Sequence, residues 1–290
     1  MLKKKFMLIG LVGLISVGLV SFCFAAFKFE GVGGRPLGMG GAFVGLADDI
    51  NTIYYNPAGL SEVRERVETY MYSQKLEVLK YHYVGIAQKN IGFSFVSQNT
   101  GNELGGKNID RQKLAMSESI FAISYGANII RTIPELSVGG SIRVLSLNSP
   151  TESGSGFCFD IGVLYKHPMY ENISFGVAIR NINAETLNEE IDEVFCIGAA
   201  YKLDAPKMTL VADIVSKKDY SKTDDTKYEY HLGVEYLPIS LLAVRLGLTE
   251  GNISWGIGLT QDKWQLDYAL GVVEALDDFN NHYISVTLKF

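Results

Sequence analysis

The chain has 290 residues, of which 47% are hydrophobic and 20% charged, with 30 glycines, 16 tyrosines, 15 phenylalanines and 3 cysteines. This composition is too apolar for a disordered chain and too poor in cysteine for a disulfide scaffold. After the first 26 residues no apolar run is long enough for a membrane-spanning helix, which excludes a polytopic helical membrane protein. A net charge of −6 argues against nucleic acid as a partner. What remains is one large β-rich domain.

The N-terminus is typical of an export signal. Lys3 to Lys5 precede an apolar stretch from Phe6 to Phe22, and Cys23-Phe24-Ala25 supplies the small residues of a cleavage site. We expect cleavage after Ala25, which makes residues 1–25 a signal peptide. The alternative is an uncleaved membrane anchor. Lipid attachment at Cys23 is not expected, because Phe22 stands where a lipoprotein signal needs a small residue.

Residues 26–66, here called the hatch segment, are rich in glycine and turn-forming residues. A phosphate-binding loop is not expected, since no Gly-Lys-Ser/Thr sequence occurs and no βαβ unit follows. Asn56 before Pro57 predicts a helix N-cap followed by a first-turn proline. The segment should therefore be a compact set of turns with one or two helical turns. Its candidate residues are Gly33, Gly34, Arg35, Gly38, Met39, Gly40, Gly41, Asp48, Asp49, Asn56, Pro57 and Gly59.

Arg35 carries the cationic charge of the hatch motif, and Asp48 and Asp49 carry the anionic charge. We expect an ion pair between Arg35 and one of these carboxylates, because a buried charge has to be paired. Two roles stay open for this pair. It either yields when a substrate enters or merely fixes the segment.

From Val67 to Phe290 apolar side chains alternate with small or polar ones, the period expected of strands. In 264–272, for example, Trp, Leu, Tyr and Val fall on one face while Gln, Asp, Ala and Gly fall on the other. The pattern predicts about fourteen strands, an even number, near 67–75, 79–88, 91–99, 118–129, 135–147, 156–166, 172–182, 192–203, 207–216, 228–237, 240–248, 252–260, 263–273 and 281–290.

The predicted connections alternate in length, with short turns such as Lys89-Asn90 and longer polar loops such as 100–117, 148–155 and 183–191. A soluble sandwich has no reason to sort its loops in this way, whereas an outer-membrane barrel has short turns at one end and longer loops at the other. We therefore predict an all-β fold, an antiparallel transmembrane β-barrel of about fourteen strands formed by residues 67–290.

The two faces of such a barrel have different surroundings, because the outer face contacts lipid and the inner face borders the lumen. Only a closed sheet can expose an apolar outer face to lipid without leaving backbone groups unpaired. The other face is rich in glycine, which leaves room in the lumen, and we expect the hatch segment to occupy that room. The polar residues expected in the lumen are Arg143, Asp160, Arg180, Asp213, Glu229, His231, Arg245 and Asp267.

The sequence gives little indication of metal binding or catalysis. Four histidines, His82, His167, His231 and His282, are scattered without a second ligand at metal-binding spacing, and no nucleophile motif surrounds a serine. We expect no metal, no cofactor and no enzyme activity. Ion pairing explains the lumenal charges more simply than a polar pore does. Cys158 and Cys196 lie on separate predicted strands, so a disulfide between them has no geometric support.

The motifs in 33–44, 47–49 and 54–60 resemble the N-terminal hatch of PorV/PorQ-type proteins within the FadL/TodX superfamily of outer-membrane barrels. The chain end agrees, because Ile284, Val286, Leu288 and the terminal Phe290 resemble the signal recognised by the barrel-assembly machinery. The resemblance implies a fourteen-stranded barrel closed by an N-terminal hatch. FadL-type members carry hydrophobic compounds inward, and PorV-type members serve secretion of proteins to the cell surface.

The sequence thus predicts a porin-like protein of the bacterial outer membrane, in contact with its lipid, that passively transports hydrophobic or amphipathic small molecules. The alternatives are a noncatalytic component of a secretion or surface-attachment system, with secretion proteins as partners, or a purely structural barrel.

We further expect a lateral entrance near 67–88, because strict alternation looks broken where Tyr70, Tyr72, Tyr81 and Tyr83 mix with Glu68, Glu77 and His82. An interrupted strand can carry a bulge that opens a gap in the wall. The alternative is that this region only contacts the hatch segment or an outer loop.

Overall fold

A computed structural model describes residues 31–75, 79–100, 116–130, 132–150, 152–186, 189–219, 225–272 and 280–290. The predicted signal peptide and Glu77 lie outside these ranges. Fourteen strands form the wall: β1 (Val67–Lys75), β2 (Leu79–Gln88), β3 (Ile91–Thr100), β4 (Ser117–Ala127), β5 (Leu136–Asn148), β6 (Ser153–Lys166), β7 (Ile173–Ile182), β10 (Glu193–Leu203), β11 (Met208–Asp219), β12 (Asp225–Ile239), β13 (Leu242–Thr249), β14 (Asn252–Gln261), β15 (Trp264–Val272) and β16 (Asn280–Lys289).

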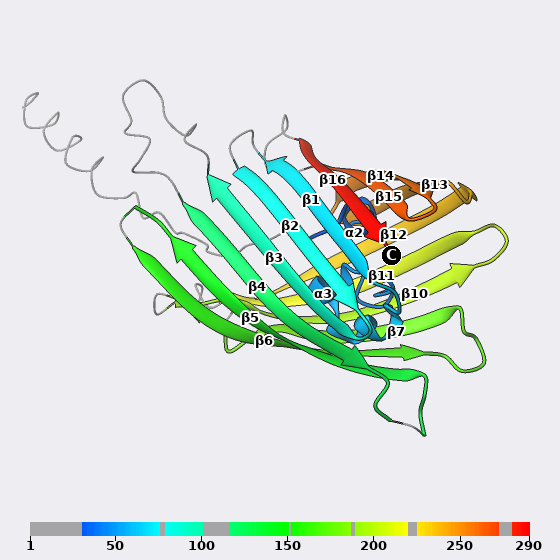
Figure 1. Ribbon diagram of the computed structural model, residues 1–290, viewed down its shortest axis with the longest axis horizontal. Helices are drawn as coiled ribbons and strands as arrows, with labels where there is room; N and C mark the ends of the chain where they lie inside the picture. The colour runs from blue at the N-terminus through cyan, green and yellow to red at the C-terminus, as the bar shows by residue number, and fades with distance from the viewer. Residues whose placement is uncertain are drawn as a thin grey trace, which may run out of the picture.

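The wall is a closed antiparallel barrel in which each strand pairs with its neighbours in the chain (Figure 1). β1 pairs with β16 to close it, with Val67 opposite Lys289, so the first and last strands share one end. The all-β, fourteen-stranded prediction is confirmed, and no strand boundary differs from its expected place by more than three residues. The period-two pattern located the strands because each has one apolar and one small or polar face.

Two of the hairpins are closed by two-residue turns in which both residues have positive φ. Lys89 and Asn90 have φ of 45° and 76° between β2 and β3, and Glu250 and Gly251 have φ of 49° and 90° between β13 and β14. Positive φ at both central residues is the requirement of a type I′ hairpin, whose twist matches that of the strands. These turns fix the register of the hairpins that they close.

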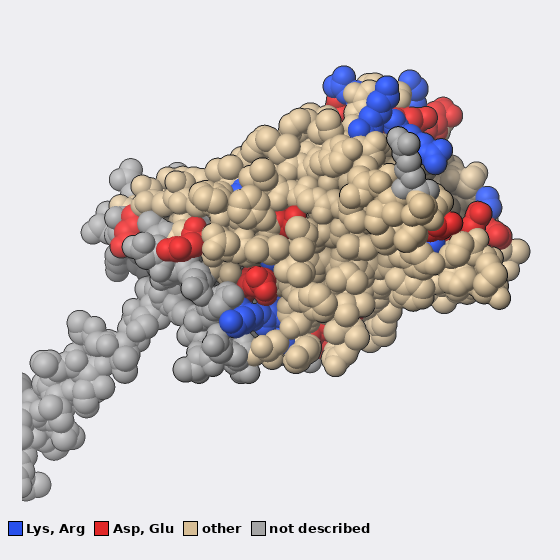
Figure 2. Space-filling model, turned by 90° about the horizontal axis from the view of Figure 1, so that it is seen from below, with Lys and Arg blue, Asp and Glu red and all other residues tan. Residues whose placement is uncertain are grey.

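The outer face of the wall is apolar. On β6, Phe157 and Ile161 point outward with 59% and 50% exposure, while Cys158 and Asp160 point inward with 0% and 1%. Figure 2 shows a largely uncharged surface, with Lys, Arg, Asp and Glu gathered at one end and a few charged groups elsewhere. Among the described residues no helix is long and apolar enough to cross a membrane.

The expected break in alternation at β1 and β2 is wrong. Tyr70 is exposed on the outer face, whereas Tyr81 and Tyr83 are fully buried inside, and both strands pair regularly along their lengths. The pattern looked mixed because aromatic rings fill the lumen here, so that both faces of β2 carry bulky side chains. The ladder shifts register elsewhere, between β6 and β7 at Phe159/Ile161 and between β12 and β13 at Tyr236/Ile239.

The loop after β7 also differs from the expected polar outer loop. It contains a short strand pair, β8 (Glu185–Thr186) and β9 (Glu189–Glu190), and its side chains Ala184, Thr186 and Ile191 are buried. Ala184 and Ile191 belong to the same apolar cluster as Leu145, Leu147 and Cys158 of the inner wall. The loop therefore packs inward.

The hatch segment contains α2 (Gly34–Gly38), α3 (Thr52–Tyr55) and the 3₁₀ helix η1 (Pro57–Glu62). In Figure 1, α2 and α3 are seen within the ring of strands that forms the wall. α2 contacts β13 to β16, whereas η1 contacts β4 to β6, on the other side of the barrel. The segment thus runs along the inner face of much of the wall.

Candidate functional site in the barrel lumen

Glycines of the inner wall make room for the backbone of the hatch segment. A Cβ added to Gly176 of β7 would lie 2.0 Å from the carbonyl oxygen of Val44, and one added to Gly247 of β13 would lie 2.0 Å from the nitrogen of Gly40. The same close approach to the hatch backbone recurs at Gly126, Gly139, Gly198 and Gly233, and a Cβ at Gly162 would meet the side-chain oxygen of Asn56. Because a real Cβ never comes this close to another heavy atom, the segment can sit here only against glycine.

Glycines with positive φ and a helix cap stabilise the local fold of the hatch segment. Gly33, Gly40 and Gly41 adopt positive φ, which favours glycine. Asn56 caps η1 by accepting a hydrogen bond from Ala58 N–H at 3.2 Å, with Pro57 in the first turn, which confirms the predicted cap. The Asn56 side-chain amide also donates to two carbonyl groups, those of Val44 and Val163, at 3.0 Å each. Asn56 therefore links the helix, the hatch turn and β6.

The remaining hatch residues are placed by close packing. Gly34 N–H donates to Ser285 Oγ at 3.1 Å, and Gly38 lies against the backbone of Gly256. Met39 is fully buried, and a Cβ at Gly59 would meet the carbonyl oxygen of Ala47 at 2.1 Å.

Arg35 is the centre of a paired ion network. Its Nη1 donates to Asp48 at 2.7 Å and to Asp49 at 2.9 Å, so the predicted ion pair forms with both carboxylates. Its Nε and Nη2 donate to the two oxygens of Glu235 on β12, at 2.9 and 2.8 Å. Lys202 of β10 adds a second cation, at 2.7 Å from Asp48. The network joins the hatch segment to two strands of the wall.

The network continues along the inner face of the wall. Arg245 of β13 donates to Glu235 at 2.7 Å and to Asp267 of β15 at 2.8 Å, and its side chain is 2% exposed. Every carboxylate in it meets a guanidinium or an ammonium group. This arrangement satisfies buried charges and holds the hatch in position.

The two hatch carboxylates have different acidities. Burial alone would raise the pKa of Asp48, but Arg35 and Lys202 attract its charge and hold the pKa well below its ordinary value. Burial raises the pKa of Asp49, because the attraction of Arg35 only partly offsets the loss of water and Asp48 adds repulsion. Asp48 is therefore the carboxylate that holds Arg35 across the wider pH range.

Asp213 of β11 binds the backbone of the hatch segment instead of a cation. One carboxylate oxygen accepts hydrogen bonds from the N–H groups of Phe43 and Val44, at 2.7 and 2.8 Å. Two successive N–H groups around one oxygen form an anion-binding turn. Asp213 is 3% exposed, so this carboxylate is a buried anchor for the middle of the segment.

Glu229 and His231 of β12 lie nearer the rim of the barrel. Glu229 accepts from Lys217 at 2.7 Å and lies 3.6 Å from His231 Nε2. The other ring nitrogen of His231 lies 2.6 Å from the carbonyl oxygen of Gly40. Among the described residues no group of three or more His, Cys, Asp or Glu is arranged to hold a metal ion.

Arg143 of β5 and Arg180 of β7 form a separate cluster around Tyr54 of the hatch. Their guanidinium carbons lie 5.5 and 5.1 Å from the centroid of the Tyr54 ring. Arg143 pairs with Asp160 at 3.5 Å and donates to the side-chain oxygen of Asn181 at 2.9 Å. Within the described ranges, Arg180 donates to the sulfur of Cys196, at 3.7 Å, and to no other side chain. Cys158 and Cys196 are free and buried.

The predicted barrel-assembly signal occupies β16 and the residue after it. Ile284 and Phe290 are exposed outside the barrel at 48% and 56%, while Ser285 and Thr287 point inward. The Phe290 N–H donates to the carbonyl oxygen of Arg66 at 2.9 Å, and the Arg66 guanidinium lies over its ring. The last residue is thereby attached to the chain just before β1.

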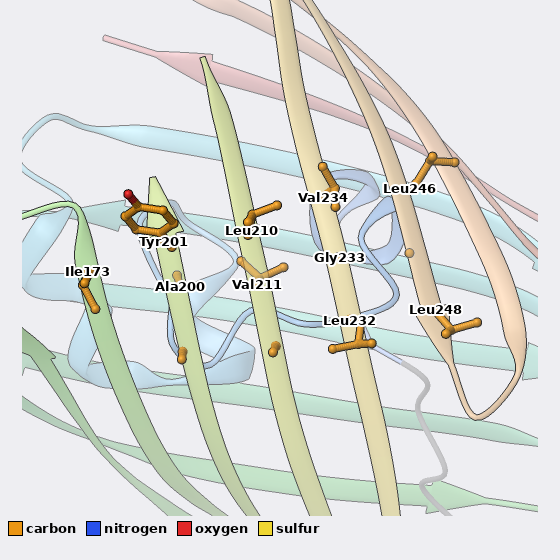
Figure 3. Close-up of a pocket in the computed structure, with 13 residues that line it drawn as sticks. Ile173, Ala200, Tyr201, Leu210, Val211, Leu232, Gly233, Val234, Leu246 and Leu248 are labelled. Carbon is orange, nitrogen blue, oxygen red and sulfur yellow. The ribbon is translucent and has the colours of Figure 1, made fainter. Parts of the chain in front are cut away.

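A shallow apolar groove crosses β10 to β13 on the outer face (Figure 3). Small side chains at Ala199 and Ala212 lie between the larger Tyr201, Leu210 and Leu232. The groove contains none of the predicted site residues, and it is separated from the charged clusters by the wall.

All eight predicted lumenal residues face inward, but they fall into separate groups: Arg245 with Asp267, Arg143 with Asp160 and Arg180, Glu229 with His231, and Asp213 alone against the hatch backbone. Sequence reasoning did not single out Lys202 and Tyr54. Lys202 lies on the inward face at the end of β10 with its side chain 47% exposed, and Tyr54 sits in a short helix where no periodicity signals its direction.

The chain resembles solved structures in fold. No protein-family model matches the sequence, and no curated protein does. The toluene transporter TbuX of Ralstonia pickettii superposes with a TM-score of 0.63 at 13% identity, covering 91% of this chain and 100% of TbuX. The monoaromatic hydrocarbon channel CymD gives 0.60 at 14% identity, covering 91% and 99%. A FadL homologue from Pseudomonas aeruginosa gives 0.57 at 8% identity, covering 89% and 98%. The chain therefore has the fold of FadL/TodX-type transporters and channels.

Proposed function

We propose that this protein is an outer-membrane barrel that passively transports hydrophobic or amphipathic small molecules, with the hatch segment as an internal plug. The observation that carries the proposal is the combination of an apolar outer wall with a separate segment that is anchored along the inner face of that wall. An apolar band around a closed barrel fits a lipid environment. A wall without a plug would serve a water-filled pore, whereas a plugged barrel selects what passes.

The likeness in fold supports the transport role, because TbuX, CymD and TodX are described as a toluene transporter and monoaromatic hydrocarbon channels. The hatch motif further supports a place among PorV/PorQ-type members, and the lysine-led apolar N-terminus supports export by a cleaved signal peptide. Outer-membrane lipid, the barrel-assembly machinery and a hydrophobic ligand are the proposed partners. We propose no catalysis and no cofactor.

Uptake of an apolar probe by intact cells tests this proposal. Cells with a lipopolysaccharide outer leaflet exclude N-phenylnaphthylamine, which fluoresces once it reaches the membrane interior. Cells producing the wild-type protein should take up the probe faster than cells carrying an empty vector. Equal rates, with the barrel shown to be folded by heat-modifiable gel mobility, would refute transport.

Deletion of residues 27–60 tests the plug separately. Conductance in planar bilayers should rise when the segment is removed, because the lumenal glycines would then border open space. An unchanged conductance would show that this segment does not close the lumen.

A further inference from the structure

One turn of the hatch segment lies against the inner faces of three neighbouring strands. Gly40 and Gly41 of this turn have φ of 69° and 76°, and the Gly40 N–H donates to Ser254 Oγ of β14 at 3.0 Å. The Gly40 carbonyl oxygen has two contacts, with Thr249 Oγ1 of β13 and with His231 Nδ1 of β12, at 2.6 Å each. A hydroxyl group and an imidazole ring therefore hold the turn at one atom.

The ring nitrogen Nδ1 of His231 has to carry a hydrogen in this arrangement. A carbonyl oxygen accepts hydrogen bonds and cannot donate one, so a bare Nδ1 would place two lone pairs 2.6 Å apart. Thr249 does not relieve this conflict, because its single hydroxyl hydrogen is donated to the same carbonyl oxygen. The contact is a hydrogen bond only when Nδ1 is the donor.

The other ring nitrogen, Nε2, is buried and has no hydrogen-bond partner among the described residues. A carboxylate oxygen of Glu229 lies 3.6 Å from it, and the side chains of His231 and Glu229 are 15% and 11% exposed. A neutral imidazole has one N–H, which Nδ1 already uses, so Nε2 would turn a lone pair towards this carboxylate. Protonation replaces that repulsion with an ion pair. The imidazolium is the form in which both nitrogens match their neighbours.

The other charged groups around this ring come from β11, from β12 and from the turn after β13. Asp213 of β11 stands opposite the histidine in the ladder, whereas the residue opposite it on β13 is the uncharged threonine. Glu229 also meets Lys217 of β11 at 2.7 Å and Lys227 of its own strand at 3.3 Å, and Lys227 pairs with Glu250 after β13. The hatch turn itself is uncharged. Two carboxylates on adjacent strands are thus available to balance a charge on the ring.

We propose that His231 is a proton-operated latch of the hatch segment, which holds the Gly40 turn when the ring is protonated and loosens it when the ring is neutral. The proposal rests on the plug role proposed above and assigns a form of regulation to it. A neutral ring has one hydrogen for two sites, so it loses either the Gly40 carbonyl or the match with Glu229. Histidine is the side chain whose charge ordinarily changes within the physiological pH range. The hatch should therefore loosen as the solution becomes more alkaline.

Conductance of the purified barrel in planar bilayers, measured at about pH 6 and about pH 8.5, tests the latch. Wild-type conductance should rise about tenfold between these pH values, the change expected for losing one interaction with a charged group. His231→Gln should show no rise, because its amide can still donate to the Gly40 carbonyl but does not titrate. His82→Gln is the matched control, because His82 contacts Tyr70 on the outer face, and it should behave like the wild type.

Nitrogen-15 NMR of histidine-labelled protein in micelles observes the proton directly, and the signals that His231→Gln lacks identify His231. Both ring nitrogens should carry hydrogen at about pH 6 and one of them at about pH 8.5. A single ring hydrogen at about pH 6 would overturn the proposal, and so would a rise in conductance that His231→Gln retains. His231→Asn is the second variant should the first not fold. Equal wild-type conductance at the two pH values would overturn the proposal whether or not either variant folded.

Deletion of residues 27–60 separates the latch from the plug. A conductance that rises on deletion but does not respond to pH in the wild type would remove the latch and leave the plug standing. A conductance that deletion does not change would remove the plug, whatever the pH profile of the histidine variants.

Discussion

The lumen contains two arginine clusters that differ in how their charge is met. Arg35, Arg245 and Lys202 pair with four hatch and wall carboxylates, Asp48, Asp49, Glu235 and Asp267, in contacts of 2.7 to 2.9 Å. Arg143 and Arg180 contact the same ring, but Asp160 pairs with Arg143, and Arg180 has no ion-pair partner among the described residues. The paired cluster is explained by its own structure. The comparison shows two ways of contacting the hatch segment, by ion pairs at Arg35 and by an aromatic ring at Arg180.

Of the variants considered for the two clusters, Arg35→Ala should have the largest effect on how the hatch segment is held. The change would leave Asp48, Asp49 and Glu235 buried without their shared cation, and breaking a buried pair costs about 3–5 kcal/mol. We expect the hatch segment to detach and conductance in planar bilayers to rise. Arg66→Ala is the matched control, because Arg66 pairs with Glu68 at the exposed rim and such pairs contribute under about 1 kcal/mol. Equal conductance in the two variants would mean that the network does not hold the hatch.

Replacing each arginine of the unpaired cluster with methionine should separate their roles. Arg143→Met would leave the 1% exposed Asp160 without its cation and should lower the free energy of unfolding by about 3 kcal/mol. Arg180→Met removes a charge that has no ion pair and should change stability by less than about 1 kcal/mol. Urea unfolding followed by the fluorescence of Trp255 and Trp264 measures both. A large loss in Arg180→Met would show that Arg180 is structural.

Asp213→Asn should loosen the middle of the hatch segment without releasing it. The variant keeps the shape of the side chain but loses the charge that the Phe43 and Val44 N–H groups bind, a loss of about 1–2 kcal/mol. Limited proteolysis should cut the segment faster while barrel mobility on gels stays the same. Wild-type protection would indicate that packing against glycine is sufficient to hold the turn.

The pH dependence of the hatch should be small until the solution is strongly acidic. The pKa of Asp48 is lowered on folding, so its contribution is present above its unfolded pKa of about 3.9 and is lost as the pH falls through the lower folded value. The pKa of Asp49 is raised, so its protonation comes first on acidification and relieves a buried charge. Conductance should therefore stay low from neutral pH to about pH 4 and rise below it. A rise between pH 7 and pH 5 would show that Asp49 is the carboxylate that matters.

Alternation predicted the wall because each strand has two environments, and the hatch motif predicted the Arg35 ion pair and the Asn56 cap because these depend on nearby residues. The sequence could not predict which wall residues pair with the charged side chains of the hatch segment. Whether Glu235 or Glu229 meets Arg35 depends on where α2 lies against β12, which alternation does not encode. β1 and β2 were misjudged for a related reason, since Tyr81 and Tyr83 fill the lumen and give the inner face the composition of an outer one.

The glycines under the hatch segment also limit the order in which the molecule can be assembled. Hatch backbone lies against strands from β4 to β14, and β1 pairs with β16 along eight residue pairs to close the wall. A finished ring of paired strands has no side opening through which this segment could be inserted. Since the segment directly precedes β1, we expect the curving sheet to wrap around it before the first and last strands meet, with closure of that seam as a late step of folding.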